Sequence, residues 1–306
     1  MKKPLFLIVT LLCLGIGTTV KAQFTDLFNF DSATGANPQG VLTYASGVLY
    51  GTTAIGGANN IGCLFSMDTN GSNYVKLLDF NSMNGACPQG SLLISGNKLY
   101  GMTDSGGAHH LGCIFSINTN GTGYKKLLDF NDTNGANPHI GSLIRIGKTL
   151  FGMTQNGGVP HGFGNIFSID TNGSNYRDLR DFSGLDGMFP WGSFTPSVTG
   201  DTLFGMTASG GTNYQGNVFS IDTNGSGYQD IFDFNGRNGG FSTGNLTLVG
   251  STLYGMTVDG GVGPYYWYGV LFSVHTNGSG FRDLLVFSGF PCYGSSTTSL
   301  VYSSGL

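Results

Sequence analysis

The sequence has 306 residues, a formal net charge of −4 and 53 glycines, and 40% of its residues are hydrophobic. All 17 acidic residues are aspartate, so glutamate, a good helix former, is absent. Charged residues make up only 10% of the chain and form no basic patch, which excludes nucleic acid as a partner. Abundant glycine and aromatic residues favour short strands joined by tight turns, so we expect an all-β fold.

The chain begins with the pattern of a cleavable export signal. Two lysines precede an uncharged apolar stretch, Leu5 to Val20, and Val20-Lys21-Ala22 places small residues where a signal peptidase cuts. The stretch is short for a transmembrane anchor, and no later segment is long and apolar enough to span a bilayer. We therefore predict a signal peptide over residues 1–22, a mature chain over residues 23–306, and a secreted or cell-surface location.

Self-similarity is the strongest pattern in the sequence, with a period of about 50 residues. Thr-Asn-Gly and a phenylalanine at the end of each repeat recur at this spacing. A tetrad that reads Leu-Tyr/Phe-Gly-Thr/Met occurs five times, with its glycine at Gly51, Gly101, Gly152, Gly205 and Gly255. We expect five repeats, over residues 40–80, 90–130, 141–182, 192–234 and 244–287.

The third repeat predicts four antiparallel strands, over residues 141–146, 149–154, 164–170 and 175–182. Asn-Gly between the last two is a preferred hairpin turn, because both residues tolerate positive φ. Apolar residues occupy both faces of the middle strands, as in sheets that pack between neighbouring sheets. A repeat of this length fits a kelch-like β-propeller blade, whereas the coils of a β-solenoid are usually shorter. We predict a β-propeller of five complete blades.

The two ends of the repeat region predict a partial sixth blade. Phe24 to Phe30 resembles a fourth strand without the first three, and Ser299 to Leu306 resembles residues 42–49. We therefore expect residues 24–30 and 295–306 to belong to one blade, as its outermost and innermost strands. Two missing strands would separate them by roughly 15 Å, at about 4.8 Å per strand. From this we expect the chain to be a C-terminally truncated form of a longer protein.

The cysteines of the mature chain are Cys63, Cys87, Cys113 and Cys292. Export makes disulfides possible, and four cysteines allow three pairings. Cys63 and Cys113 occupy the same position in adjacent repeats, which places them beyond the roughly 7 Å Cα separation that a disulfide can bridge. We therefore do not expect these two to pair.

The order Tyr-Gly-Met-Thr, then Gly-Gly, then Gly-x-Ile-Phe-Ser resembles the Gloeo/Verruco (GloVer) tandem repeat of exported bacterial proteins. The resemblance covers residues 24–302, and five copies keep the motif. It implies a secreted or surface-displayed propeller, attached in many cases through a C-terminal anchoring or sorting domain. It offers no catalytic residues that could be assigned to this chain.

Non-repeating residues gather in the loops between second and third strands and in the connections between blades, which share one face of a propeller. Exposed aromatic rings stack on sugars and are enriched where proteins bind partners, although aromatic residues more often serve packing. The predicted ligand contacts are Trp191, Tyr214, Tyr265, Tyr266, Trp267 and Tyr268.

Four histidines occupy the same face and are weak candidates for metal ligands: His109, His110, His139 and His161. Their spacing does not enforce convergence on one ion, and solvated loop residues explain them better than a metal site does. We therefore predict neither a metal site nor a cofactor.

Without glutamate, any acid/base pair must be built from aspartate. The aspartates that depart from the repeat are Asp31, Asp104, Asp132, Asp186, Asp201 and Asp259. No nucleophile or phosphate-binding motif accompanies them. The sequence thus favours a non-enzymatic exported module for binding or adhesion, with a glycan or cell-surface component as partner. An exported hydrolase or lyase that uses Asp and His on the loop face is the alternative, and a purely structural role is a third.

Overall fold

The computed structural model describes residues 24–261, 268–287 and 300. These residues form five antiparallel four-stranded sheets and no helix. The predicted signal peptide and the aromatic residues Tyr265, Tyr266 and Trp267 lie outside the described residues. In the described part of the chain, no helix could cross a membrane.

Each sheet contains four strands that are consecutive in the chain and paired in chain order. The first sheet consists of β1 (Thr43–Ala45), β2 (Val48–Thr53), β3 (Cys63–Asp68) and β4 (Val75–Asp79). The second consists of β5 (Leu93–Ser95), β6 (Lys98–Thr103), β7 (Cys113–Asn118) and β8 (Lys125–Asp129). The third consists of β9 (Ile144–Ile146), β10 (Thr149–Thr154), β11 (Asn165–Asp170) and β12 (Arg177–Asp181). The fourth consists of β13 (Thr195–Pro196), β14 (Thr202–Met206), β15 (Asn217–Asp222) and β16 (Gln229–Asp233). The fifth consists of β17 (Thr247–Val249), β18 (Thr252–Met256), β19 (Val270–His275) and β20 (Arg282–Val286).

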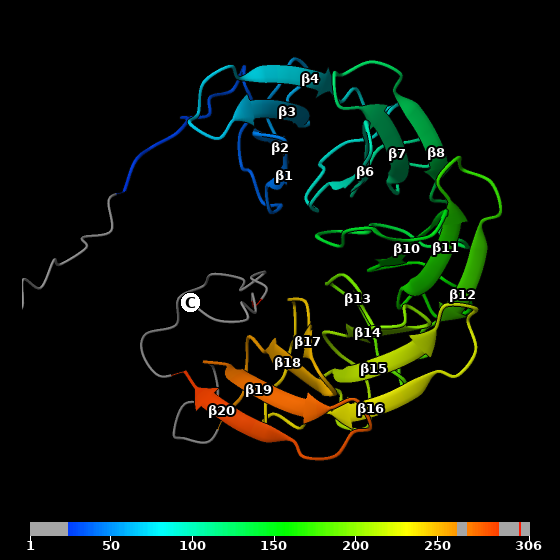
Figure 1. The fold of residues 1–306 in the computed structure, drawn as a ribbon. Coiled ribbons are helices and arrows are strands. Elements are labelled where there is room, and N and C mark those ends of the chain that lie inside the picture. Colours follow the sequence, from blue (N-terminus) through cyan, green and yellow to red (C-terminus); the bar gives the residue numbers. More distant parts are fainter. Residues whose placement is uncertain (1–23, 262–267, 288–299, 301–306) are drawn as a thin grey trace, which may run out of the picture.

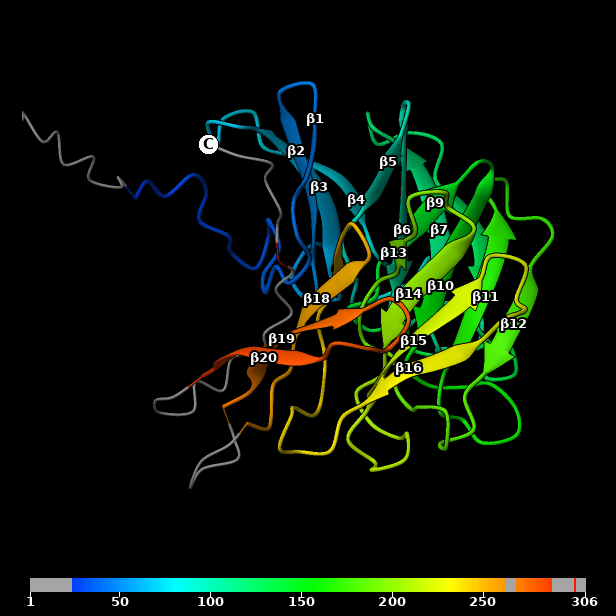
Figure 2. The ribbon, with the colours of Figure 1, turned by 60° about the horizontal axis from the view of Figure 1, so that its bottom comes forward.

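The five sheets lie around a common centre like the blades of a propeller (Figure 1). In each sheet the first strand faces the centre and the fourth lies at the outer rim, and the turned view shows the sheets stacked side by side (Figure 2). The predicted all-β, blade-like repeat is therefore confirmed, and we refer to the sheets as blades one to five.

The third blade shows how closely the repeat pattern predicts the strands. β10 spans the predicted residues 149–154, and Gly147-Lys148, the two residues between the first two predicted strands, join it to β9. The first strand is shorter than predicted, because it begins at Ile144 instead of residue 141. The backbone N–H of Ser142 donates to the hydroxyl of Ser193 in the next blade, 2.9 Å away. This segment is therefore bound across blades, outside its own sheet.

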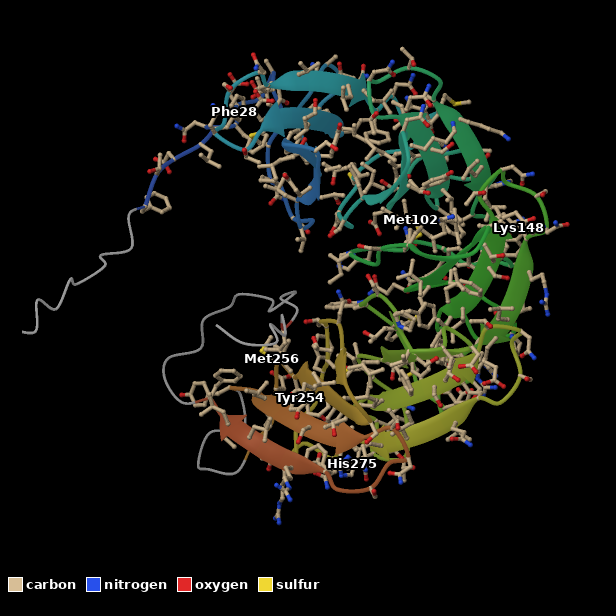
Figure 3. All side chains as sticks on the ribbon, viewed as in Figure 1. Phe28, Met102, Lys148, Tyr254, Met256 and His275 are labelled. Carbon is tan, nitrogen blue, oxygen red and sulfur yellow. The ribbon has the colours of Figure 1, made fainter. Side chains whose placement is uncertain are left out.

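Side chains alternate between the two neighbouring blades, as the apolar pattern predicts. Leu150 packs in a cluster with the second blade, whereas Phe151 and Met153 of the same strand pack in a cluster with the fourth. Figure 3 shows side chains filling the space between the sheets. The hydrophobic core is therefore a series of layers between blades.

A repeated aromatic contact fixes each layer at its outer end. The phenylalanine after each fourth strand packs edge-on against a phenylalanine in the third strand of the next blade. The ring centroids are 5.5 Å apart for Phe80–Phe115, 5.6 Å for Phe130–Phe167, 5.5 Å for Phe182–Phe219 and 5.1 Å for Phe234–Phe272. The end-of-repeat phenylalanine is thus conserved among the blades because it covers the next one.

The ends of the repeat region make contacts of the same kind. Phe30 packs edge-on against Phe65 at 5.1 Å, although the described residues 24–30 form no strand. At the other end, the Thr247 hydroxyl donates to the carbonyl of Leu300, as Thr195 does to Leu246 one blade earlier. Leu300 therefore takes the position of Leu42, so the expected match of residues 299–306 to residues 42–49 was wrong by one residue. The partial sixth blade itself stays a prediction.

Cys63 and Cys113 are free and buried, so the prediction that they do not pair is confirmed. Each Sγ lies 3.3 Å from a threonine hydroxyl of the neighbouring strand, Thr53 and Thr103 respectively. Burial raises the pKa of the Cys113 thiol to about 11. Cys87 is also free, and Cys292 lies outside the described residues.

The tetrad glycine recurs because no side chain fits there. In the fourth blade, a Cβ added to Gly205 would lie 2.5 Å from Cζ of Phe219. We expect Gly205→Ala to lower the free energy of unfolding by about 1–3 kcal/mol, the usual cost of overpacking a core. Urea denaturation would measure it. The double variant Gly205→Ala, Phe219→Leu should lose less free energy of unfolding than the two single variants lose together. A loss equal to that sum would contradict the steric explanation.

Candidate functional site

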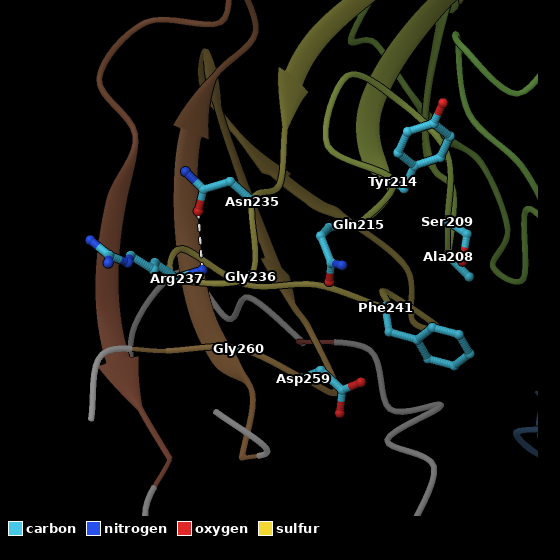
Figure 4. Close-up of a pocket in the computed structure, with 10 residues that line it drawn as sticks. All are labelled: Ala208, Ser209, Tyr214, Gln215, Asn235, Gly236, Arg237, Phe241, Asp259 and Gly260. Carbon is cyan, nitrogen blue, oxygen red and sulfur yellow. Dashed lines mark hydrogen bonds between the residues drawn. The ribbon is translucent and has the colours of Figure 1, made fainter. Parts of the chain in front are cut away.

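A cavity of about 510 Å³ opens on the loop face at the junction of the fourth and fifth blades. Three segments build it: the loop between β14 and β15, the connection from β16 to β17, and the loop after β18. Figure 4 shows the residues that line it. They are Ala208, Ser209, Tyr214, Gln215, Asn235, Gly236, Arg237, Phe241, Asp259 and Gly260.

The cavity exists because this junction departs from the repeat. At each junction, one residue before the first strand of a blade forms an isolated backbone β-bridge with the loop after the second strand of that blade. At the other junctions this residue is an alanine or a methionine, as in Ala36 and Met188. At this junction it is Gly240, and a Cβ there would lie 2.7 Å from Oε1 of Gln215. The missing side chain therefore leaves room for the Gln215 amide.

Gln215 also differs from the residues at its position in the first three blades. Its backbone carbonyl accepts the N–H of Phe241, the same bond that the carbonyls of Ile61, Leu111 and Phe163 accept in the first three blades. Those three residues carry apolar side chains. Only the fourth of these four blades therefore places a side-chain amide at this point of the loop face.

Two aromatic residues of the cavity are held in a left-handed backbone conformation. Tyr214 has φ of 57° and Phe241 has φ of 53°, a region that bulky residues rarely adopt. The loop position of Tyr214 is Asn60 in the first blade and His110 in the second, defined by the same backbone bond to a glycine carbonyl. Asn60 and His110 have φ of 57° and 62°, so the left-handed turn belongs to the repeat, and what the fourth blade adds is an aromatic side chain that is 64% exposed.

Asp259 supplies the carboxylate of the cavity. It occupies the bridge position that is Ile55, Ser105, Asn156 and Ser209 at the other junctions. Burial raises the pKa of Asp259 above its usual range. Among the described residues, its carboxyl group has no ion-pair partner. It is thus a partly buried acceptor without a compensating charge.

The predicted contact residue Trp191 lies beside the cavity. Its ring packs edge-on against Phe241, with centroids 5.2 Å apart, and His139 lies 5.1 Å away on another side. Its indole N–H is buried and has no acceptor in the described part of the chain. Trp191 therefore belongs to the wall behind Phe241, half-buried, and supports the cavity from outside.

The structure brings some predicted residues together and leaves others apart. Tyr214 lines the cavity, and Tyr268, also half-buried, holds the position in the fifth blade that Gln215 holds in the fourth. His109, His110 and His161 are exposed loop residues, and His139 pairs with Asp104 at 3.7 Å. No group of three or more metal-ligating side chains occurs in the ranges described.

The repeat pattern has a counterpart among known families. The model of the Gloeobacter/Verrucomicrobia repeat matches residues 17–200 and 141–306. This chain belongs to the Gloeobacter/Verrucomicrobia repeat family. The resemblance expected from the tetrad is therefore confirmed, while the kelch-like type stays a prediction. No curated protein matches the sequence.

Solved structures similar to this member of the Gloeobacter/Verrucomicrobia repeat family share its fold at low sequence identity. A chain of a nidogen/laminin complex matches with TM-score 0.52 and 13% identity, covering 80% of this chain and 78% of that one. The GH74 enzyme of Niastella koreensis matches with TM-score 0.50 and 13% identity, over 78% of this chain and 36% of that one. A structure from a study of two prolyl endopeptidases matches with TM-score 0.50 and 12% identity, over 83% and 37%. These neighbours indicate a β-propeller and include both binding proteins and enzymes, so they do not separate the two functions.

Sequence reasoning missed Gln215, Phe241 and Arg237, and it considered Asp259 only as a catalytic candidate. The signal that could have found Gln215 and Arg237 is their departure from the other repeats. Phe241 gives no such signal, because Phe189 holds the same position one blade earlier. That comparison identifies unusual positions, but it does not say that they meet in one cavity.

Proposed function

We propose that this chain is an exported, non-enzymatic propeller that binds a glycan at the cavity between the fourth and fifth blades. The observation that carries the proposal is Tyr214, an exposed ring held at φ 57° on the rim of a polar cavity. A flat aromatic ring offers a stacking surface to a sugar ring, and polar groups below it supply orientation. The export signal predicted over residues 1–22 agrees with an extracellular ligand.

The ligand contacts we propose are centred on Tyr214, Phe241 and Gln215. Phe241 contributes an apolar wall, and Gln215 can both donate and accept hydrogen bonds. Trp191 holds Phe241 in place from behind. The aromatic residues Tyr265, Tyr266, Trp267 and Tyr268 follow Asp259 in the chain and stay proposed contacts of the same site.

We expect Tyr214→Ala to weaken binding to an immobilised polysaccharide about tenfold, because a central aromatic contact contributes more than about 1 kcal/mol. The matched control is Tyr44→Ala, since Tyr44 is 62% exposed, close to the 64% of Tyr214, and lies in the first blade. Binding would be measured on a panel of plant and bacterial polysaccharides. Equal affinities of the Tyr214→Ala variant and the unmodified protein would overturn the proposal.

An exported hydrolase or lyase is the second candidate, and one contact favours it. Asp104 Oδ1 accepts the backbone N–H of His139 at 3.1 Å and lies 3.7 Å from its Nδ1, beside Trp191. One bridging water would connect the two side chains for proton transfer. The test is release of soluble sugar from a polysaccharide that the protein binds. If release occurs and His139→Ala abolishes it, the non-enzymatic proposal is wrong.

A further inference from the structure

The cavity lining includes one carboxylate, Asp259, and one cationic side chain, Arg237, and the amide of Gln215 is among its other polar groups. Asp259 and Gln215 both replace the residue types found at their positions in other blades, and both reach the same cavity (Figure 4). The carboxylate accepts hydrogen bonds only, and the amide can do both. A ligand that satisfies Asp259 must therefore bring hydrogen-bond donors.

Arg237 does not compensate Asp259, although it contributes to the cavity lining. Its guanidinium extends away from Gln215 and Asp259 in Figure 4. Its backbone N–H is held by the Asn235 side chain, 3.1 Å away, which fixes the turn. In the described residues, no other lysine, arginine or histidine forms an ion pair with Asp259. A negatively charged ligand that lies between Gln215 and Asp259 would thus meet a like charge that Arg237 does not pair.

We infer that the cavity selects an uncharged, hydroxyl-rich sugar and rejects sugars that carry carboxylates. Neighbouring hydroxyl groups of the sugar donate to Asp259, the Gln215 amide bonds a further hydroxyl, and Tyr214 stacks on the ring. This inference rests on the proposed function and adds the class of glycan. Partial burial strengthens each bond to the carboxylate, because water competes less there.

The experiment compares matched oligosaccharides by isothermal titration calorimetry at neutral pH. The probes are cello- and malto-oligosaccharides and, as the acidic counterpart, oligogalacturonides of equal length. We expect at least tenfold tighter binding of a neutral probe than of the acidic one. Equal or tighter binding of oligogalacturonides would overturn the selectivity and leave the proposed function standing. Failure of every probe to bind would overturn the proposed function as well.

Asp259→Asn tests the role of the carboxylate with little change of shape. We expect it to weaken the neutral sugar about tenfold and to reduce the discrimination against oligogalacturonides. The control is Asp132→Asn, a like change on the same face at a position with φ of 75°, which asparagine tolerates. If Asp259→Asn binds both probes as the unmodified protein does, the inference is wrong. Circular dichroism of each variant establishes that the fold is retained.

Discussion

Replacing Phe167 with alanine should lower the free energy of unfolding by about 3–5 kcal/mol, the range for phenylalanine in a well-packed core. The Phe167 side chain is fully buried between the second and third blades. Its ring meets Phe130 edge-on at 5.6 Å and stacks with Tyr176 at 6.0 Å. Because Phe130 comes from the preceding blade, the substitution removes both a core side chain and a link between blades.

Urea denaturation followed by tryptophan fluorescence would measure this loss. The matched control is Phe24→Ala, since Phe24 is 87% exposed and should change stability by less than about 0.5 kcal/mol. A loss of less than about 1 kcal/mol in the Phe167→Ala variant would contradict the assignment of this ring to the layer between blades.

The sequence predicts the blades well because each repeat encodes one sheet and its two apolar faces. The alternation of Leu150 against Phe151 places these side chains on opposite neighbours, and the structure confirms both. The strand pairing follows from short turns such as Gly147-Lys148, which leave little choice of register. Local pattern and tertiary packing agree in β10 and in the turn that precedes it.

Predictions failed where a contact between blades overrides the local pattern. The segment before Ile144 reads as strand, yet Ser142 bonds Ser193 of the next blade instead of its own sheet. The match of residues 299–306 to residues 42–49 was wrong by one residue, as the bond from Thr247 to Leu300 shows beside the equivalent bond from Thr195 to Leu246. Neither bond can be inferred from one repeat alone.

The candidate site was only partly predictable for the same reason. Tyr214 stands out by residue type in an otherwise polar loop, and Trp191 is one of the two tryptophans of the sequence. Gln215 and Asp259 line one cavity because the loop of the fourth blade lies against the loop of the fifth. The cavity also needs a glycine at position 240, because a side chain there would meet the Gln215 amide. That contact is visible only in the folded structure.

Two pairs of carboxyl groups should make the stability of this protein depend on pH. A bulge in each blade places the second and fifth residues of the fourth strand on one face, where the first blade pairs Lys76 with Asp79 at 3.0 Å. The third blade has Asp178 and Asp181 in these places. The fourth blade has Asp230 and Asp233.

Burial and the neighbouring carboxylate raise the pKa of Asp178 to about 6. Burial also raises the pKa of Asp230 to about 6, and Asp233 and Asp186 add repulsion. The folded state thus holds these protons more tightly than the unfolded chain, whose aspartates have a pKa of about 3.9. Stability should therefore rise as the pH falls from 7 through 6 towards 4. Below that range it should fall, because the pKa values of Asp31, Asp170, Asp186 and Asp201 are lowered.

The double variant Asp178→Lys, Asp230→Lys rebuilds the pair of the first blade in the third and fourth. We expect each substitution to contribute about 1 kcal/mol at pH 7, after allowing for solvent screening, and the melting temperature to rise by about 3–6 °C in total. The gain should shrink as the pH falls from 7 to 5, because protonation already relieves the repulsion in the unmodified protein.

The reciprocal variant, Lys76→Asp, creates a third carboxyl pair in the first blade and serves as the control. Its melting temperature should be lower at pH 7 and should rise more steeply on acidification than that of the unmodified protein. Differential scanning calorimetry between pH 4 and pH 8 would measure all three proteins. Parallel profiles of melting temperature against pH for the three proteins would contradict this explanation, because the carboxyl pairs would then not be the source of the pH dependence.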